Sequence, residues 1–350
     1  MDCYAAVDLG TNNCRLLVAT PERQGFRVVE AFSRIVRLGD GLSRTGRLDP
    51  AAMDRALAAL TICADKMKRR RVVGVRAVAT QACRSAENGD EFIARAERET
   101  GVKLQVITPR EEAQLSVAGC LGLLDRESDA ALVLDVGGGS TELSWVDLRN
   151  TGCASVPLSA EKLPIKAWVS TPVGVVTLAE HFPEPSPPTE AWFRNMVDYV
   201  KAKLADFTHA DDFRDIFTAG RAHLIGTSGA ITSLAGLHLG LRRYERAKVD
   251  GLWLTRNDCE MAAGRLMTLG AKARAGEPCI GPDRADLVLA GAAILQAVQE
   301  LWPCERVRVA DRGLREGLLL SLMGQGSNRP RRARRRRRRG GRGAQVAASA

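Results

Sequence analysis

The first third of the chain alternates between short apolar runs and stretches with an apolar residue at every third or fourth position. Apolar runs at residues 4–20, 26–36, 72–79 and 104–107 predict strands. The helical period appears at residues 50–70 and 87–100, and again from Pro109 onward. Strands and helices that alternate in this way are typical of an α/β lobe, which we expect to close near Asp125.

A second lobe of similar character follows. A strand at residues 130–136 continues as a hairpin to residue 146, and helices are predicted at 174–182, 190–207, after Gly229, at 257–269 and at 283–301. We therefore divide the chain into a first lobe (1–125), a second lobe (126–305), a last strand and helix that return to the first lobe (306–323), and a disordered Arg-rich tail (324–350).

Composition excludes several classes of protein. Apolar residues make up 45% of the chain and charged residues 26%, which is typical of a soluble globular protein. No apolar run reaches the length of a membrane span and no signal peptide is visible, so we expect a cytoplasmic protein that is not bound to a membrane. Nine cysteines without any Cys-x-x-Cys pair, and only four histidines, argue against zinc and against a disulfide framework.

The net charge of +10 arises from the C-terminal tail alone. Ten arginines lie in residues 325–350, which contain no lysine and no acidic residue, so the rest of the chain is neutral overall. A flexible polycation binds polyanions through counterion release, and RNA is one candidate. A tail that binds nothing specifically is the plainer interpretation, and the sequence leaves it open.

Two stretches repeat one pattern, an apolar strand that ends in Asp-x-Gly, a small polar turn and a second apolar strand. They are YAAVDLGTNNCRLLVA at residues 4–19 and ALVLDVGGGSTEL at residues 131–143. Such a turn lets backbone N–H groups approach a phosphate, and the carboxylate can hold the Mg²⁺ that neutralises it. One such turn is also a common structural device, but one at the start of each lobe favours a phosphate site.

A third glycine-rich turn, IGTSGAIT at residues 225–232, precedes a helix. Ser228 and Gly229 would place backbone N–H groups at the start of that helix, which is a second kind of anion site. An ordinary helix cap by Ser228 explains the same residues equally well.

Taken together, these stretches resemble the exopolyphosphatase and guanosine pentaphosphate phosphatase family, which shares the superfold of actin and the sugar kinases. The further matching stretches are RLGDGL (37–42), ATQACRSAEN (79–88), ITPREEAQL (107–115), TPVGVVTLAEHF (171–182), GTSGAITSLAGL (226–237) and RADLVLAGAAIL (284–295). The resemblance implies an α/β fold with two ribonuclease-H-like lobes facing a cleft. It also implies Mg²⁺-dependent hydrolysis of a terminal phosphoanhydride, and a homodimer is one assembly state that it suggests.

The resemblance also implies roles for individual residues. Glu112 matches the catalytic glutamate that activates water, Asp135 and Glu142 match carboxylates at the metal, and Asp8 is a further candidate ligand. The matching phosphate-binding positions are Thr11, Asn12, Asn13, Arg84, Gly137, Gly138, Gly139 and Ser140, to which the third turn adds Ser228 and Gly229. Without the resemblance, a solvated glutamate in the first turn of a helix would be the simpler interpretation of Glu112.

The sequence does not distinguish between two substrates of one reaction class. Inorganic polyphosphate is the first expectation and guanosine pentaphosphate the alternative, because no nucleobase pocket can be read from the sequence. An ATP-dependent kinase of the same superfold and a non-enzymatic polyanion-binding protein are the remaining alternatives. The glutamates at 111 and 112, followed by DVGGGSTEL, favour activation of water over phosphoryl transfer to a bound acceptor.

Overall fold

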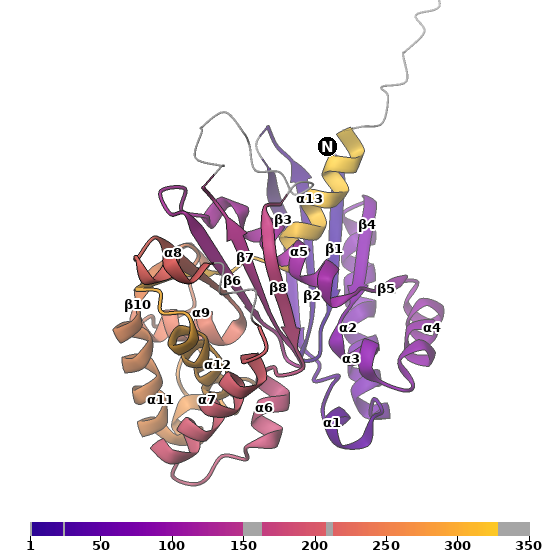
Figure 1. Ribbon diagram of the computed structural model, residues 1–350. Coiled ribbons are helices and arrows are strands. Elements are labelled where there is room, and N and C mark those ends of the chain that lie inside the picture. The colour runs from indigo at the N-terminus through magenta and orange to yellow at the C-terminus, as the bar shows by residue number, and fades with distance from the viewer. Residues whose placement is uncertain (1, 24, 150–162, 208–212, 328–350) are drawn as a thin grey trace, which may run out of the picture.

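Two β-sheets form the framework of the protein in a computed structural model that describes residues 2–23, 25–149, 163–207 and 213–327 (Figure 1). The first sheet has the order β3-β2-β1-β4-β5 and the second the order β10-β11-β9-β6-β7-β8. Each sheet is the centre of one lobe, and the lobes stand side by side in Figure 1. The predicted two-lobed α/β fold is confirmed.

The first lobe begins with the predicted hairpin. Its strands are β1 (Cys3–Leu9), β2 (Asn13–Pro21), β3 (Phe26–Ile35), β4 (Val72–Ala79) and β5 (Leu104–Val106), and its helices are α1 (Leu42–Thr45), α2 (Pro50–Arg69), α3 (Gln81–Ser85) and α4 (Gly89–Thr100). The strands β1 and β2 are antiparallel, whereas β4 and β5 continue the sheet in parallel. Residues 5–7 of β1 are completely buried, as expected for the central strand of a covered sheet.

The second lobe repeats the hairpin and adds a larger helical layer. Its strands are β6 (Ala130–Val136), β7 (Thr141–Asp147), β8 (Ile165–Thr171), β9 (Ala222–Thr227), β10 (Trp253–Thr255) and β11 (Arg306–Ala310). Its helices are α6 (Val175–His181), α7 (Glu190–Leu204), α8 (Arg214–Thr218), α9 (Gly229–His238), α10 (Arg246–Val249), α11 (Arg256–Ala275) and α12 (Val288–Leu301). The fully buried Trp145 stacks on Phe213 at a centroid distance of 4.8 Å and anchors this core.

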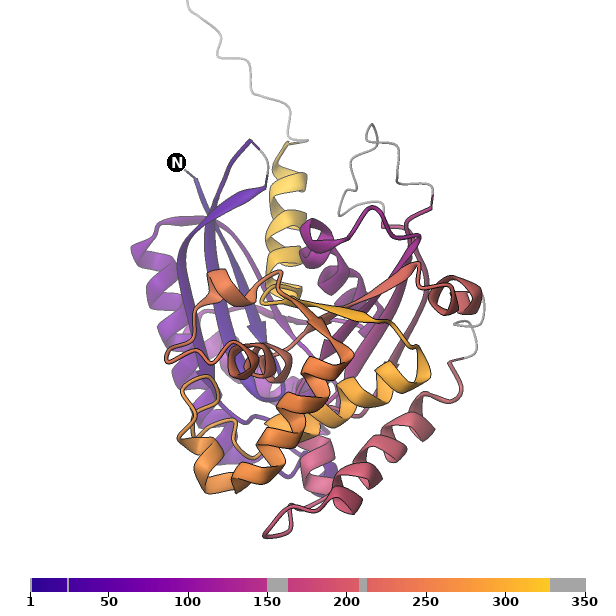
Figure 2. The same ribbon diagram turned by 90° about the vertical axis from the view of Figure 1, so that its left-hand side faces the viewer.

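Two helices lie between the sheets, α5 (Pro109–Cys120), which runs into the short 3₁₀ helix η1 (Leu121–Leu123), and α13 (Leu314–Ser327) (Figures 1 and 2). Leu115 on α5 and Leu318 on α13 pack against the inner face of the first sheet. Val117 and Cys120, one turn further along α5, pack against the second sheet. Because both lobes bury surface on this helix pair, the pair fixes how the lobes sit relative to each other.

Polar contacts join the lobes at the rim on the α1 and α6 side. The carboxylate of Glu180 on α6 accepts hydrogen bonds from the backbone N–H of Gly41 at 2.9 Å and from the hydroxyl of Ser43 at 2.5 Å. Arg37 of the first lobe pairs with Asp286 of the second at 2.9 Å. These contacts supplement the helix pair in holding the lobes together.

The structure corrects the predicted return of residues 306–323 to the first lobe. Strand β11 stays in the second sheet, where it is parallel to β9 and antiparallel to β10, because its fully buried Val307 and Val309 are enclosed there. It is α13 that packs against the first sheet. It also continues to Ser327, past the predicted order boundary at residue 324, because extending an existing helix needs no new nucleus.

Several elements differ from their predicted bounds. The strands β8, β9 and β10 and the short helices α1, α3, α8 and α10 were not predicted, and α12 begins at Val288 rather than at residue 283. The rest of the predicted tail, residues 328–350, lies outside the described residues. Within the described ranges, no helix combines the length and the apolar character needed to cross a bilayer.

Candidate active site

The turns of the two hairpins meet in a cleft of about 390 Å³ between the lobes. Asp8 lies near the end of β1 and Asp135 near the end of β6, so each hairpin contributes one aspartate to the cleft wall. The predicted phosphate-binding residues in the same wall are Thr11, Asn12, Asn13, Gly137, Gly138, Gly139, Ser140, Ser228 and Gly229. The structure therefore brings together residues that lie more than 200 positions apart in the sequence.

Glycine is required where the two turns touch. A Cβ atom on Gly138 would lie 3.0 Å from the Cβ of Thr11 and 3.1 Å from the backbone nitrogen of Asn12. A Cβ on Gly139 would lie 2.7 Å from the Thr11 hydroxyl oxygen. The absence of side chains in the second turn thus lets the first turn approach it and exposes backbone N–H groups to the cleft.

Glu112 enters the cleft from the first turn of α5. Pro109 and the side chain of Thr108, which accepts a hydrogen bond from the N–H of Glu111 at 3.2 Å, fix the start of this helix. The Glu112 side chain is buried and accepts a hydrogen bond from Arg84 at 3.2 Å. Burial, followed by the charge of Glu142, raises its pKa well above the usual glutamate value, although Arg84 opposes this shift.

Asp135 and Glu142 lie directly opposite each other on β6 and β7. Burial raises the pKa of Asp135 to about 6, against a hydrogen bond from Ser116. Burial and the charge of Asp135 raise the pKa of Glu142 to about 7, and a 2.7 Å hydrogen bond from Ser170 partly offsets this. These shifts arise mainly from the burial of closely spaced carboxylates, which is common at active sites.

A divalent cation fits this surplus of oxygen ligands. Burial also raises the pKa of Asp8, and the side-chain oxygens of Asn12 and Asn13 are buried without a hydrogen-bond donor among the described residues. The described residues contain no group of three or more acidic, histidine or cysteine side chains arranged as a metal cage. Mg²⁺ usually takes only one or two protein carboxylates, together with water and phosphate oxygens, so Asp8 and Asp135 suit it.

The third turn also reaches the cleft. The hydroxyl of Ser228 accepts the N–H of Ile231 at 2.9 Å and so caps α9, which is the ordinary role that the sequence left open. The guanidinium of Arg284 stands over the same helix start, with its central carbon 3.6 Å from the position of a Cβ on Gly229. A helix N-terminus beside an arginine provides two favourable partners for an anion.

Two predicted residues contact the site without lining the cleft. Arg84 lies behind Glu112, where it also donates to the carbonyl of Ile107 at 2.7 Å and to the side chain of Gln81 at 2.6 Å. Glu142 is held between β7 and β8 by Ser170. Both influence the site through charge, and their direct contact with phosphate or metal stays a prediction.

Sequence reasoning missed several side chains of the cleft wall, namely Arg15, Tyr244, Arg284 and Arg315. The side chains of the three arginines make no ion pair or hydrogen bond with any of the described residues. Arg15 was within reach of the sequence, because the predicted hairpin places it directly opposite Asp8. No local sequence pattern pointed to Arg315 as a site residue, because it reaches the cleft only through the position of α13 between the lobes.

Comparison with known proteins identifies the family of this chain. The model of the Ppx/GppA phosphatase family matches residues 17–325. This chain belongs to the Ppx/GppA phosphatase family. The resemblance seen in the sequence motifs is thereby confirmed, and membership of a phosphatase family makes the protein a hydrolase.

The relatives of this Ppx/GppA chain have two kinds of name. It is 30% identical over 333 residues to exopolyphosphatase 2 of Mycobacterium tuberculosis, covering 91% of this chain and 98% of the relative. It is 31% identical over 322 residues to guanosine-5'-triphosphate,3'-diphosphate pyrophosphatase of Aeromonas hydrophila, covering 92% of this chain but only 59% of that longer protein. The crystal structure of the Aquifex aeolicus family member superposes with a TM-score of 0.74 at 27% identity, over 94% of this chain and 99% of that one.

The raised carboxyl pKa values predict that this Ppx/GppA protein loses stability as pH rises from about 6.5 to 8 in metal-free buffer. In that interval the folded state binds more protons than the unfolded state, because the pKa of Glu142 is about 7 against an ordinary 4.5. Its stabilising contribution, complete below the unfolded pKa, is lost as pH passes the folded value. We expect the free energy of unfolding, measured in urea, to fall by on the order of 1 kcal/mol from Glu142 alone.

The variant Glu142→Gln is the control for this pH dependence, and its stability should change less over the same interval. His223, whose pKa burial lowers from an ordinary 6.5 to about 4, releases its proton in the unfolded state near the lower edge of this interval and so opposes the trend slightly, but it is the same in both proteins and cancels in the comparison. A wild-type protein whose stability is constant or rises between pH 6.5 and 8 would contradict the assignment.

Proposed function

We propose that this protein is an exopolyphosphatase, which hydrolyses the terminal phosphoanhydride of inorganic polyphosphate and releases orthophosphate. The supporting observation is the meeting of Glu112 with the two hairpin turns in a cleft that also holds three unpaired arginines. Polyphosphate, rather than a nucleotide, is favoured by the match to an exopolyphosphatase over 98% of that relative's length.

In the proposed reaction, Glu112 accepts a proton from the water that attacks the terminal phosphorus. The bond from that phosphorus to the bridging oxygen breaks, so orthophosphate leaves and the chain is shortened by one unit. Backbone N–H groups of residues 137–140 and the unpaired Arg15, Arg284 and Arg315 orient the phosphate chain and offset its charge. Because Arg84 holds the Glu112 carboxylate at 3.2 Å, it orients the base toward the cleft.

Asp8 and Asp135 would hold Mg²⁺, with the oxygens of Asn12 and Asn13 nearby. When bound, the ion supplies positive charge to phosphate oxygens. A bound cation favours ionised carboxylates, so millimolar Mg²⁺ should raise the midpoint of thermal unfolding more at pH 8 than at pH 6.5. Equal shifts at both pH values would argue against binding at these residues.

Guanosine pentaphosphate remains the second candidate substrate, because a relative of similar identity is named for a guanosine polyphosphate. Phosphate release from polyphosphate and from guanosine pentaphosphate, at equal concentration of ends, separates the two. We expect faster release from polyphosphate. Faster release from the nucleotide would identify guanosine pentaphosphate, and not polyphosphate, as the preferred substrate.

The Arg-rich tail is proposed to capture polyphosphate, because residues 325–350 carry ten arginines and no acidic residue. A chain that ends at Ser327, where α13 ends, lacks all ten of these arginines. Over a salt series, the full chain should show a steeper decline of apparent polyphosphate affinity than the chain that ends at Ser327. Identical slopes would remove the tail from the proposal, and tighter binding of RNA than of polyphosphate would assign it to RNA.

A further inference from the structure

Arg315 occupies an unusual position for an arginine. It lies in the first turn of α13 and lines the cleft beside Asp8 and Arg15. It is partly buried, yet its side chain makes no hydrogen bond or ion pair with any residue that the structure describes. Desolvation of its guanidinium lowers its pKa, and the charges of Glu316 and Asp8 oppose that shift only in part. An arginine removed from water without a partner is costly and is normally avoided.

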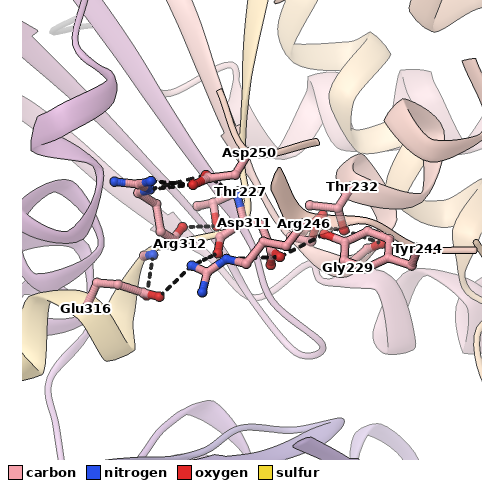
Figure 3. Close-up of polar contacts among 11 residues, drawn as sticks. Thr227, Gly229, Thr232, Tyr244, Arg246, Asp250, Asp311, Arg312 and Glu316 are labelled. Carbon is pink, nitrogen blue, oxygen red and sulfur yellow. Dashed lines mark hydrogen bonds and ion pairs between the residues drawn. The ribbon is translucent and has the colours of Figure 1, made fainter. Parts of the chain in front are cut away.

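The charged residues on either side of Arg315 are paired, and these pairs fix the segment. Arg312 donates to Asp250 at 3.0 Å. Glu316 accepts from the backbone N–H of Gly313 at 2.9 Å and from Arg246 at 3.1 Å (Figure 3). Two of the three charged side chains in this stretch therefore hold it in place, and the remaining one faces the cleft.

The backbone around Arg315 has little freedom to move. Arg246, which binds Glu316, also donates to the carbonyl of Asp311 at 2.6 Å, and the hydroxyl of Thr227 donates to the carbonyl of Arg312 at 2.8 Å (Figure 3). The turn that leads into α13 is thus tied to the end of β9 and to the start of α10. A side chain carried by a fixed backbone is well suited to bind an anion without loss of entropy in the chain.

We propose that Arg315 binds oxygens of the substrate's phosphate chain and so is a further substrate-binding residue of the cleft. The inference rests on the proposed function, since it takes the ligand to be a linear phosphoanhydride. A guanidinium offers two parallel N–H groups that match two phosphate oxygens, which a lysine cannot reproduce. The alternative role for Arg315 is an internal counter-charge to Asp8, which would require no ligand.

Binding of tripolyphosphate by titration calorimetry tests the proposal. The titrations use full-length Glu112→Gln protein, so that no turnover is needed, with Mg²⁺ and about 0.3 M salt to suppress binding by exposed arginines. Adding Arg315→Gln should weaken the affinity about 10- to 100-fold, and adding Arg315→Lys about 3- to 10-fold. The control is Arg69→Gln, which removes one exposed charge at the end of α2, outside the cleft wall, and should have little effect.

Equal affinity with and without Arg315→Gln, or a loss no larger than that from Arg69→Gln, would overturn the proposal. If Arg315→Gln unfolds the protein, the test rests on Arg315→Lys. Equal affinity for tripolyphosphate with and without Arg315→Lys would then overturn the proposal. The result is separable from the proposed function. Wild-type protein that binds tripolyphosphate through Arg315 but hydrolyses no polyphosphate contradicts only the function, whereas hydrolysis without dependence on Arg315 contradicts only this inference.

Discussion

Glu112→Gln is expected to abolish most turnover while the protein still binds tripolyphosphate. The amide keeps the size of the side chain and its contact with Arg84, but it cannot accept a proton from water. Loss of a general base typically lowers the rate about 10²- to 10⁴-fold. Because burial raises the pKa of Glu112, the neutral amide should leave the fold at least as stable as in the wild-type protein at neutral pH.

The neighbouring variant Glu111→Gln is the matched control. The same glutamate-to-glutamine substitution is made here one residue earlier in the chain. Glu111 pairs with Arg76 and does not line the cleft. Phosphate release at saturating substrate should therefore stay close to the wild-type rate. If Glu112→Gln retained more than about a tenth of the wild-type rate, or if both variants lost turnover equally, Glu112 would not be the base.

The hairpins and the start of α5 were predictable because each is encoded locally, whereas the role of Glu112 was predicted only from the family resemblance. A run of apolar residues, an Asp-x-Gly and a small polar turn specify a strand and its end, and Thr108-Pro109 marks where α5 begins. Once each sheet forms, its aspartate lies near a strand end, and the packing of α5 and α13 between the sheets brings both aspartates to one cleft. The glycines of the second turn also predicted a close approach of another group to the backbone. The sequence did not indicate that this group would be Thr11 of the other lobe.

The cationic half of the site was not predictable in the same way. Arg284 begins the matched stretch at residues 284–295, but nothing in the sequence gave it a role in the site. Arg315 lies in the first turn of a helix, and its sequence context is that of any arginine on a solvated surface. Both reach the cleft through contacts between segments far apart in the chain. The missed strands have a related cause, since β10 has three residues and the edge strand β8 exposes Lys166 and Trp168. Short or half-exposed strands carry little periodic signal.

Helix α5 carries Glu112 and helix α13 carries Arg315, and the two helices pack against each other. This close packing depends on glycine. A Cβ on Gly119 would lie 1.9 Å from the carbonyl oxygen of Gly313, which is backbone and cannot rotate away. Gly317 repeats the arrangement on the other helix, where a Cβ would lie 2.0 Å from the carbonyl oxygen of Leu115. The two helices therefore pack with their backbones in direct contact.

We expect Gly119→Ala to destabilise the protein by about 1–3 kcal/mol or more, because the methyl group must push α13 away from α5. Gly264→Ala on α11 is the control, since nothing lies within 4 Å of its Cβ position. Alanine favours a helix over glycine by up to about 1 kcal/mol, so that variant should be as stable as the wild-type protein or more stable. Urea denaturation gives both values.

The same displacement should weaken catalysis beyond the loss of stability. The Gly313 turn carries Arg315 into the cleft, and α5 carries Glu112, so separating the helices moves the two groups apart. Phosphate release by Gly119→Ala should fall at temperatures where the variant is fully folded, with a higher KM if Arg315 binds substrate. Stability and KM equal to those of the wild-type protein would show that α5 and α13 do not pack this closely in solution.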